Sequence, residues 1–453
     1  MDMTDVSQLA RLGLFDARVP RYTSYPTAPH FSDAVGPDRF ADWIGAIPAG
    51  SELSLYIHIP FCRRLCWFCA CRTQGTTSGA PVAAYVETVK AELRLLHAAL
   101  PPRVTLSHLH WGGGTPTLLD PDMMRDLTAA IFGGTPMAPG GEFSVEIDPN
   151  EIDDARLDAL AEAGMTRASI GVQDFDPEIQ KIIGREQSFE ITEAAVNGIR
   201  ARGIDSLNTD ILYGLPHQTQ ARMTESVQKL LSLSPDRVAL YGYAHVPWMA
   251  RRQTLIPSDA LPTPEERLRL FDTARRLFLW DEYDEIGIDH FARKGDGMAL
   301  AARDGTLRRN FQGYTVDTAA ALVGLGASAI SRFPQGYAQN DPGTGRYTDA
   351  VRSGRFATKR GHAFTREDHI RGRLIEQLMC RFRTDRAEVE RDLGADPAEL
   401  DALFADARSA FGGFVRGTPG GIEITPEGRP LARMVAHALD AYALDRAGHS
   451  PAV

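Results

Sequence analysis

Cysteine is scarce in this sequence, which has five in 453 residues, and four of the five fall within residues 62–71. Long apolar runs are absent as well, and none approaches the roughly 20 residues that a membrane-spanning helix needs. The first residues also lack the basic and apolar pattern of a secretory signal. The sequence therefore predicts a cytoplasmic protein without membrane contact. Thiols stay reduced in that compartment, which argues against a disulfide framework.

An excess of positive charge is missing too. There are 49 Lys and Arg residues against 59 Asp and Glu residues, which gives a net charge of −10. This balance argues against non-specific binding of nucleic acid, so we expect no nucleic-acid partner. A hydrophobic content of 43% and a length of 453 residues predict a globular chain with one large α/β domain and smaller appendages.

Strand-like and helix-like segments alternate through the middle of the chain. Apolar, β-rich runs occur at 53–59, 106–111, 143–147, 168–172, 207–213, 237–243 and 284–288. Segments with helical spacing occur at 83–100, 155–164, 188–203, 222–234 and 264–280. This alternation predicts an α/β fold around a parallel sheet, either a partial barrel of six strands with an extra edge strand or something wider.

The chain divides into three parts by composition. Residues 1–50 include PRYTSYPTAPHF, a stretch without periodicity, and predict an extended N-terminal arm that is a candidate lid. Residues 51–340 hold the alternating segments and predict the barrel domain. Residues 360–453 predict a small C-terminal domain that is mainly helical or winged-helix-like.

The clustered cysteines follow the first predicted strand with the spacing Cys-x3-Cys-x2-Cys-x-Cys. Structural zinc usually needs two pairs of ligands, and no second Cys/His pair with that spacing follows. A redox dithiol would use Cys66 and Cys69 but leave Cys62 and Cys71 unexplained. Thiolates in one tight loop can hold an iron–sulfur cluster, and three ligands would leave one iron open to a small molecule. Zinc and inert thiols remain alternatives at this point.

The first three cysteines have the spacing of the radical S-adenosylmethionine enzymes, which this sequence resembles. Phe68, just before the third cysteine, belongs to the same pattern. If a nucleoside cofactor sits on the cluster, glycine and polar residues should gather at the C-terminal ends of the next strands. The second predicted strand does end in the glycines of WGGGTPT, residues 111–117, where a backbone without side chains can approach a ligand closely.

Polar residues also lie in or near the ends of the third, fourth and fifth predicted strands. They are Glu146, Gln173 and Asp210. A carboxylate within an apolar strand is costly unless it is paired or liganded. Glu146 would suit an amino group and Asp210 ribose hydroxyls, although a salt-bridged or capping role is equally open for each residue alone.

A closer resemblance, to the oxygen-independent coproporphyrinogen III oxidase family, runs from about residue 20 to the C-terminus. The stretches that carry it are LYIHIPFCRRLCWFCAC, LHWGGGTPT, RASIGVQDFD, DILYGLPHQT, GIDHFAR and RRNFQGYT, together with the PRYTSYPTAPHF arm. One departure is Arg72, which follows Cys71 where many members have Asn. The resemblance implies a partial (β/α)6-type barrel of parallel strands.

The resemblance also implies the site residue by residue. Cys62, Cys66 and Cys69 would ligate a [4Fe–4S] cluster, and Cys71 would be needed without being a ligand. Two S-adenosylmethionine molecules are implied. Positions matching their contacts are Tyr56, Phe68, Gly112, Gly113, Gly114, Thr115, Glu146, Gln173, Arg185, Asp210, Ala244, Phe311, Gln312 and Ile330. His58 lies on the same strand face as Tyr56 and joins Tyr56 and Cys71 as a catalytic candidate, with a core histidine as the plainer interpretation.

The implied reaction is the oxidative decarboxylation of two propionates of coproporphyrinogen III to vinyl groups, giving protoporphyrinogen IX for haem biosynthesis. A reducing electron donor such as flavodoxin or ferredoxin and a monomeric state are family expectations. A haem chaperone or a tetrapyrrole methyltransferase of the same superfamily is the alternative. Cys71 speaks against the chaperone, because related chaperones end the motif in Cys-x-Phe.

Overall fold

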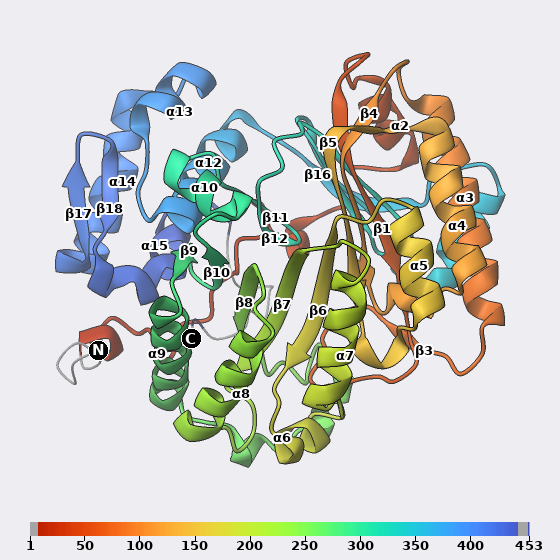
Figure 1. Cartoon of the computed structure of the whole chain (residues 1–453). Helices are drawn as coiled ribbons and strands as arrows, with labels where there is room; N and C mark the ends of the chain where they lie inside the picture. Colours follow the sequence, from red (N-terminus) through yellow and green to blue (C-terminus); the bar gives the residue numbers. More distant parts are fainter. Residues whose placement is uncertain (1–7, 443–451, 453) are drawn as a thin grey trace.

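A twelve-stranded sheet forms the centre of the computed structural model, which describes residues 8–442 and residue 452 (Figure 1). The strand order is β16-β15-β14-β13-β1-β4-β5-β6-β7-β8-β10-β9. The parallel strands are β13 (Leu322–Leu325), β1 (Glu52–Ile59), β4 (Thr105–Gly113), β5 (Met137–Ile147), β6 (Arg167–Gln173), β7 (Ser206–Tyr213) and β8 (Arg237–Gly242).

Helices follow six of these strands in the chain. They are α3 (Ala80–Ala99), α4 (Pro121–Gly134), α5 (Asp154–Glu162), α6 (Pro177–Ile182) with α7 (Phe189–Arg200), α8 (Gln220–Ser232) and α9 (Pro264–Trp280). The predicted partial (β/α)6-type barrel is therefore confirmed, and helices cover the outside of the curved sheet (Figure 1).

Local sequence signals explain where these helices begin and end. Asp120 accepts a hydrogen bond from the Met123 N–H at 2.8 Å and so caps the start of α4. Thr263 and Glu266 form a capping box at the start of α9. Gly164 and Gly203, at φ +83° and +75°, stop α5 and α7 in the left-handed conformation that glycine adopts at low cost.

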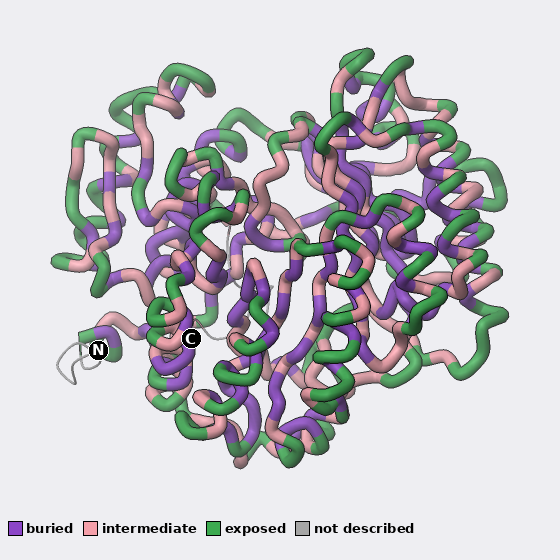
Figure 2. The backbone as a smooth tube through the Cα atoms, in the orientation of Figure 1, coloured by how far each residue is buried: buried purple, intermediate pink, exposed green. Residues whose placement is uncertain are grey.

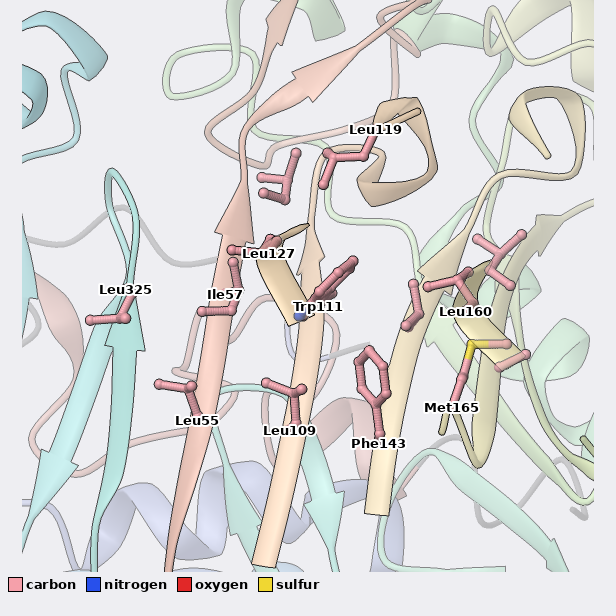
Figure 3. Close-up of a cluster of buried hydrophobic side chains, with 14 of the residues drawn as sticks. Leu55, Ile57, Leu109, Trp111, Leu119, Leu127, Phe143, Leu160, Met165 and Leu325 are labelled. Atoms are coloured by element: carbon pink, nitrogen blue, oxygen red, sulfur yellow. The ribbon is translucent and has the colours of Figure 1, made fainter. Parts of the chain in front are cut away.

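The main hydrophobic core lies between the sheet and these helices. Leu55 and Ile57 of β1 face the helices beside Trp111 of β4, and all three are at most 2% exposed (Figure 3). The Trp111 ring meets Phe143 of β5 edge to face, with centroids 5.4 Å apart. Figure 2 shows the same arrangement as buried strands inside a more exposed shell of helices. Truncating one such side chain to alanine typically costs about 2–5 kcal/mol.

The two ends of the sheet differ from the pattern expected from the sequence. The seventh predicted run is a strand, β9 (Tyr283–Ile286), but it is antiparallel to β10 (His290–Arg293), which is itself antiparallel to β8. A link this short joins only antiparallel strands. At the other end, β13 adds a parallel strand that was not predicted. It continues into the antiparallel strands β14 (Ile330–Phe333), β15 (Gly336–Asn340) and β16 (Thr358–Ala363).

The C-terminal part has its own hydrophobic core, in which Leu374, Leu378 and Phe404 are buried. Its elements are α12 (Arg366–Arg381), α13 (Arg386–Leu393), α14 (Pro397–Phe411), a hairpin of β17 (Val415–Thr418) and β18 (Gly421–Ile424), and α15 (Ala432–Ala438). Leu14 and Tyr22 of the predicted arm join this core. Further along the arm, α2 (Pro37–Gly45) instead packs on the barrel core. In the described part of the chain, no helix has the length and apolarity needed to cross a membrane.

Candidate active site

Side chains along the barrel strands alternate between the helices and a central cavity. In β1, Ser54, Tyr56 and His58 line this cavity of about 420 Å³. The neighbouring strands contribute more polar groups in the same way: His108, His110, Glu142, Ser144, Glu146, Arg167, Ser169, Asn208, Asp210, Arg237 and Tyr241. The barrel therefore encloses a polar lumen within an apolar outer layer.

The glycine run at the end of β4 lies where the backbone must approach other groups closely. A Cβ on Gly112 would lie 2.7 Å from Glu146 Oε1, and one on Gly114 would lie 2.5 Å from the Phe61 carbonyl oxygen. Gly113 has φ +113°, and its Cβ would lie 2.5 Å from His58 Cε1. The Gly113 N–H donates to Glu146 Oε2 at 2.9 Å. No side chain fits at these three positions without displacing the site.

Two half-buried carboxylates of the lumen ionise differently. Burial disfavours the charged form of Glu146, but the His110 ring at 3.4 Å and the Gly113 N–H outweigh it, so the pKa of Glu146 lies below its usual value. Burial and the charge of Glu146 raise the pKa of Asp210 to about 6. Asn208 Nδ2 donates to Asp210 Oδ1 at 3.1 Å. The lumen thus holds one firmly ionised carboxylate and one that is readily protonated.

Tyr56 and His58 form a hydrogen-bonded pair, with Tyr56 Oη 2.9 Å from His58 Nδ1. Burial lowers the pKa of His58 and raises that of Tyr56 well above its usual range. The proton therefore stays on the phenol, and a neutral imidazole accepts it. His58 Nε2 is buried without a hydrogen-bond partner among the described residues. Tyr56 stacks on His110, with ring centroids 5.7 Å apart.

The loop with four cysteines leaves the end of β1 and is fixed at both ends. Its first residues form β2 (Phe61–Cys62), which pairs in parallel with β3 (Gln74–Gly75). In the middle, the Trp67 N–H donates to the Ile183 carbonyl oxygen at 2.9 Å. The Cys71 N–H donates to Cys69 Sγ at 3.4 Å. The four thiols are thus held above the C-terminal ends of the barrel strands.

The chemistry of this loop fits an iron–sulfur cluster. Among residues 8–442 and 452, no three His, Cys, Asp or Glu side chains stand close enough to form a finished metal site. Burial raises the pKa of Cys62 to about 11, and negative charge on Cys69 or Cys66 raises it further. Arg185 Nη1 lies 3.6 Å from Cys66 Sγ. Three adjacent thiols beside a guanidinium are a donor set for thiolate-bound iron.

Two predicted residues lie at or just beyond the end of β6. Arg185 donates through Nη2 to the Gly171 carbonyl oxygen at 2.8 Å and lies 3.5 Å from Asp148 Oδ2. Its buried Nε has no hydrogen-bond partner among the described residues. Gln173 holds φ +68°, a strained value for a residue with a side chain. Such strain is common at binding sites, where neighbouring structure maintains it.

Beyond the end of β8, Gln253 contacts two of the predicted site residues, Phe68 and Ala244, although Gln253 itself was not predicted. Gln253, in the 3-10 helix η4 (Arg251–Leu255), is 1% exposed. Its Nε2 donates to the Phe68 carbonyl oxygen at 2.7 Å and to the Ala244 carbonyl oxygen at 3.0 Å, and its Oε1 accepts from the Val246 N–H at 2.6 Å. Gln253 therefore ties the cysteine loop to the barrel. It lies in a loop without periodicity, so no sequence signal marks it.

The structure does not bring every predicted residue into one cavity. Seven line the lumen: Tyr56, His58, Glu146, Asp210, Phe311, Gln312 and Ile330. The glycine run and Gln173 lie at strand ends, and Arg185 lies in the loop between α6 and α7. The Thr115 N–H donates to the Phe61 carbonyl oxygen at 2.7 Å. Ala244 lines a separate cavity of about 360 Å³ that also touches α9 and the C-terminal part.

The lumen also contains a layer of charged side chains that was not predicted from the sequence. His108 Nδ1 lies 3.3 Å from Asp317 Oδ1, and Arg167 Nη2 lies 3.0 Å from Glu142 Oε2. Arg237 Nε lies 2.7 Å from Asp296 Oδ1. The signal was present, because His108, Glu142 and Arg167 continue the period-two alternation of their strands.

Comparisons with known proteins agree with this geometry. The profile described as the radical SAM superfamily matches residues 56–230. The oxygen-independent coproporphyrinogen III oxidase of Paracoccus denitrificans is 66% identical over 451 residues, with 100% of both chains covered. The enzyme of that name from Escherichia coli is 37% identical, with 97% of this chain and 96% of the other covered. A solved structure of coproporphyrinogen III oxidase from Escherichia coli, described as a radical SAM enzyme, matches with a TM-score of 0.89 and 36% identity, and covers 94% of this chain and 100% of that one.

The profile match and the barrel with its cysteine loop define this chain as a radical SAM enzyme, a class that uses a [4Fe–4S] cluster and S-adenosylmethionine. Full-length identity then narrows the class. The chain belongs to the oxygen-independent coproporphyrinogen III oxidases.

Proposed function

We propose that the polar lumen beneath the cysteine loop is where this enzyme decarboxylates two propionates of coproporphyrinogen III to vinyl groups, giving protoporphyrinogen IX for haem biosynthesis. The observation that carries the proposal is the cysteine loop that follows the lumen residues Tyr56 and His58 at the end of β1, in a chain 66% identical to a relative named for this reaction. When bound, the cluster and S-adenosylmethionine would supply a 5′-deoxyadenosyl radical that takes a hydrogen atom from a propionate. The substrate radical would then lose carbon dioxide and pass one electron to a separate electron acceptor.

In this proposal Cys62, Cys66 and Cys69 would hold the cluster. Cys71 is no ligand and instead orients Cys69, to whose sulfur its N–H donates. Tyr56 and His58 would act as catalytic residues. Their shared hydrogen bond keeps a proton on Tyr56 Oη beside the lumen. The His58 Nε2 atom, which has no hydrogen-bond partner in the described part of the chain, would be available to a bound group.

The remaining predicted residues would bind S-adenosylmethionine. Glu146, ionised and fixed by the Gly113 N–H, suits the amino group. Arg185 offers a planar guanidinium to the carboxylate, and Asp210 suits the ribose hydroxyls. The positions Gly112, Gly114, Thr115, Phe68, Gln173 and Ala244 would complete this site. Phe311, Gln312 and Ile330, which reach the lumen from the other wall, would contact a second molecule.

The partners and the organisation of the chain belong to the same proposal. A reducing electron donor such as flavodoxin or ferredoxin would reduce the cluster, and the enzyme would act as a cytoplasmic monomer without nucleic acid or membrane. Residues 1–50 would form an arm that covers the site, residues 51–340 the barrel domain, and residues 360–453 a C-terminal domain.

One anaerobic assay tests this function. The protein is reconstituted with iron and sulfide, reduced with dithionite, and supplied with S-adenosylmethionine and coproporphyrinogen III. We expect 5′-deoxyadenosine and protoporphyrinogen IX together, two equivalents of carbon dioxide per porphyrinogen, and loss of the cluster chromophore in C66A. Formation of 5′-deoxyadenosine without the divinyl product would overturn the assignment of substrate while keeping the enzyme class.

A further inference from the structure

Two segments of this acidic chain carry only positive charge. Residues 61–80 and 244–258 together contain five arginines and no acidic residue, in a protein of net charge −10. The five are Arg63, Arg64, Arg72, Arg251 and Arg252. Arg63 lies 3.7 Å from Glu151. Within the described residues, Arg64, Arg72 and Arg251 are exposed and form no ion pair. The two segments thus present positive charge beside the cysteine loop, with Glu151 as the acidic neighbour of Arg63.

The two segments form one continuous surface. Arg252 Nη2 donates to the Cys71 carbonyl oxygen at 3.1 Å and to Thr73 Oγ1 at 2.9 Å. The neighbouring Gln253 donates to the Phe68 carbonyl oxygen at 2.7 Å. The cysteine loop therefore lies directly against the segment 244–256, and groups exposed on either segment border the site where the cluster would bind.

Large apolar side chains are exposed on the same segment. Trp248 is 53% exposed, Met249 is 65% exposed and Leu255 is 57% exposed. They are three of the seven large hydrophobic residues that are exposed in the described part of the chain. Arg18 extends over the Trp248 ring, with Cζ 5.2 Å from the centroid. Apolar side chains bordered by charge are the usual composition of a protein-binding surface.

We propose that this surface docks a small acidic protein that carries one electron at a low-potential centre. We name it the arginine face. It comprises Arg63, Arg64, Arg72, Trp248, Met249, Arg251, Arg252 and Leu255. The inference rests on the proposed function, in which a donor loses one electron and the cluster gains it. Electrons transfer efficiently only over short distances, so the donor must dock beside the cysteine loop. Positive charge here attracts an acidic carrier, whereas the net negative charge of the enzyme repels that carrier elsewhere.

The test replaces two arginines of the arginine face that contact neither lumen nor cysteine sulfur, as R64E/R251E. The probe is reduced flavodoxin, an acidic one-electron carrier. We expect its Kd for the reconstituted enzyme, and for the apoprotein, to rise at least about tenfold at low salt. Flavodoxin-supported turnover should fall in parallel. The rate with dithionite and the cluster absorption spectrum should stay as in the wild type. The matched control is R391E/R416E, which reverses two exposed arginines of the C-terminal part.

A second variant addresses the apolar component. W248S should weaken flavodoxin binding without changing how steeply Kd depends on salt, since it removes contact area but no charge. An unchanged flavodoxin Kd in R64E/R251E would overturn the proposal. If R64E/R251E instead raises the KM for coproporphyrinogen III with dithionite as reductant, the arginine face binds substrate and the proposal is wrong. If the wild type is a dimer that dissociates in this variant, the face binds a second copy of the chain, and the proposal is again wrong. If the wild type shows no turnover of coproporphyrinogen III with dithionite, the proposed function is refuted, whatever the flavodoxin measurements show.

Discussion

Single residues of the site could be predicted where a residue type is unusual for its position in the sequence. Glu146 and Asp210 stand out because they are carboxylates in apolar strands, and both line the lumen. Gly112–Gly114 stand out as a run, and each lacks space for a Cβ. Gln253 breaks no rule in sequence, because a glutamine in an irregular segment is ordinary. Its importance arises only from where the chain places the Phe68 and Ala244 carbonyl oxygens.

The substitution G113A tests the glycine run at this scale. The added Cβ would lie 2.5 Å from His58 Cε1, and φ +113° is strained for alanine. We expect the reconstituted variant to keep its cluster absorption but to bind S-adenosylmethionine at least about tenfold more weakly, as measured by anaerobic equilibrium dialysis.

The matched control is G133A in α4, where a Cβ meets nothing within 4 Å. Alanine in a helix is favoured over glycine, so this variant should bind the cofactor normally and unfold at the same or a higher temperature. Normal cofactor binding by G113A would show that the backbone at Gly113 does not define the site.

At the scale of elements, prediction succeeded where a segment is long and periodic. The strands β1, β4, β6, β7 and β8 and helices such as α9 lie close to their predicted ranges, because period and caps agree. The strand β5 begins six residues before its predicted start, and the two-residue strands β2 and β3 were not predicted. The short strand β13 was not predicted, since its four residues, interrupted by Gly324 and followed by Gly326, carry no clear period. The direction of β9 depends on its short link to β10, which the alternation of strands and helices does not reveal.

Gln253 permits a prediction about how η4 holds the cysteine loop. In Q253L, the Phe68 and Ala244 carbonyl oxygens and the Val246 N–H would lose their partner, and each unsatisfied buried group costs about 1–3 kcal/mol. We expect the loop to open more often, so that iodoacetamide alkylates the apoprotein thiols several times faster than in the wild type. T254A, at the exposed neighbouring position, should alkylate at the wild-type rate. Equal rates in Q253L and T254A would contradict this role.

At the scale of the whole molecule, a buried carboxylate joins the outer helices to the added strands. Glu92 of α3 is 0% exposed and accepts hydrogen bonds from the Gly326 N–H at 2.8 Å, Asn340 Nδ2 at 2.7 Å and Tyr347 Oη at 2.7 Å. Tyr85, about two helix turns before Glu92 in α3, donates to the His58 carbonyl oxygen at 2.9 Å. The packing of β13 to β15 against α3 thus reaches the back of the active site.

Glu92 makes the stability of the fold depend on pH. Burial raises its pKa to about 7 from the ordinary 4.5. Below pH 4.5 the group is neutral in both folded and unfolded chains. As pH rises towards 7 only the unfolded chain ionises, so the free energy of unfolding falls by about 3 kcal/mol and then levels off. Urea unfolding of the apoprotein from pH 4.5 to 7.5 should show this loss in the wild type relative to E92Q. Parallel pH profiles for the two proteins would refute it.

The division between a polar lumen and an apolar outer layer has a consequence for how this architecture diversifies. The side chains that hold the strands to the helices, such as Ile57, Leu109 and Trp111, belong to the buried core and are not among the residues that line the lumen. Replacing a lumen side chain therefore alters reactivity while the scaffold still assembles. Related barrels can therefore acquire new substrates through substitutions among the residues that line the lumen. In the same way, a lumen variant that folds but is inactive has lost catalysis and not stability.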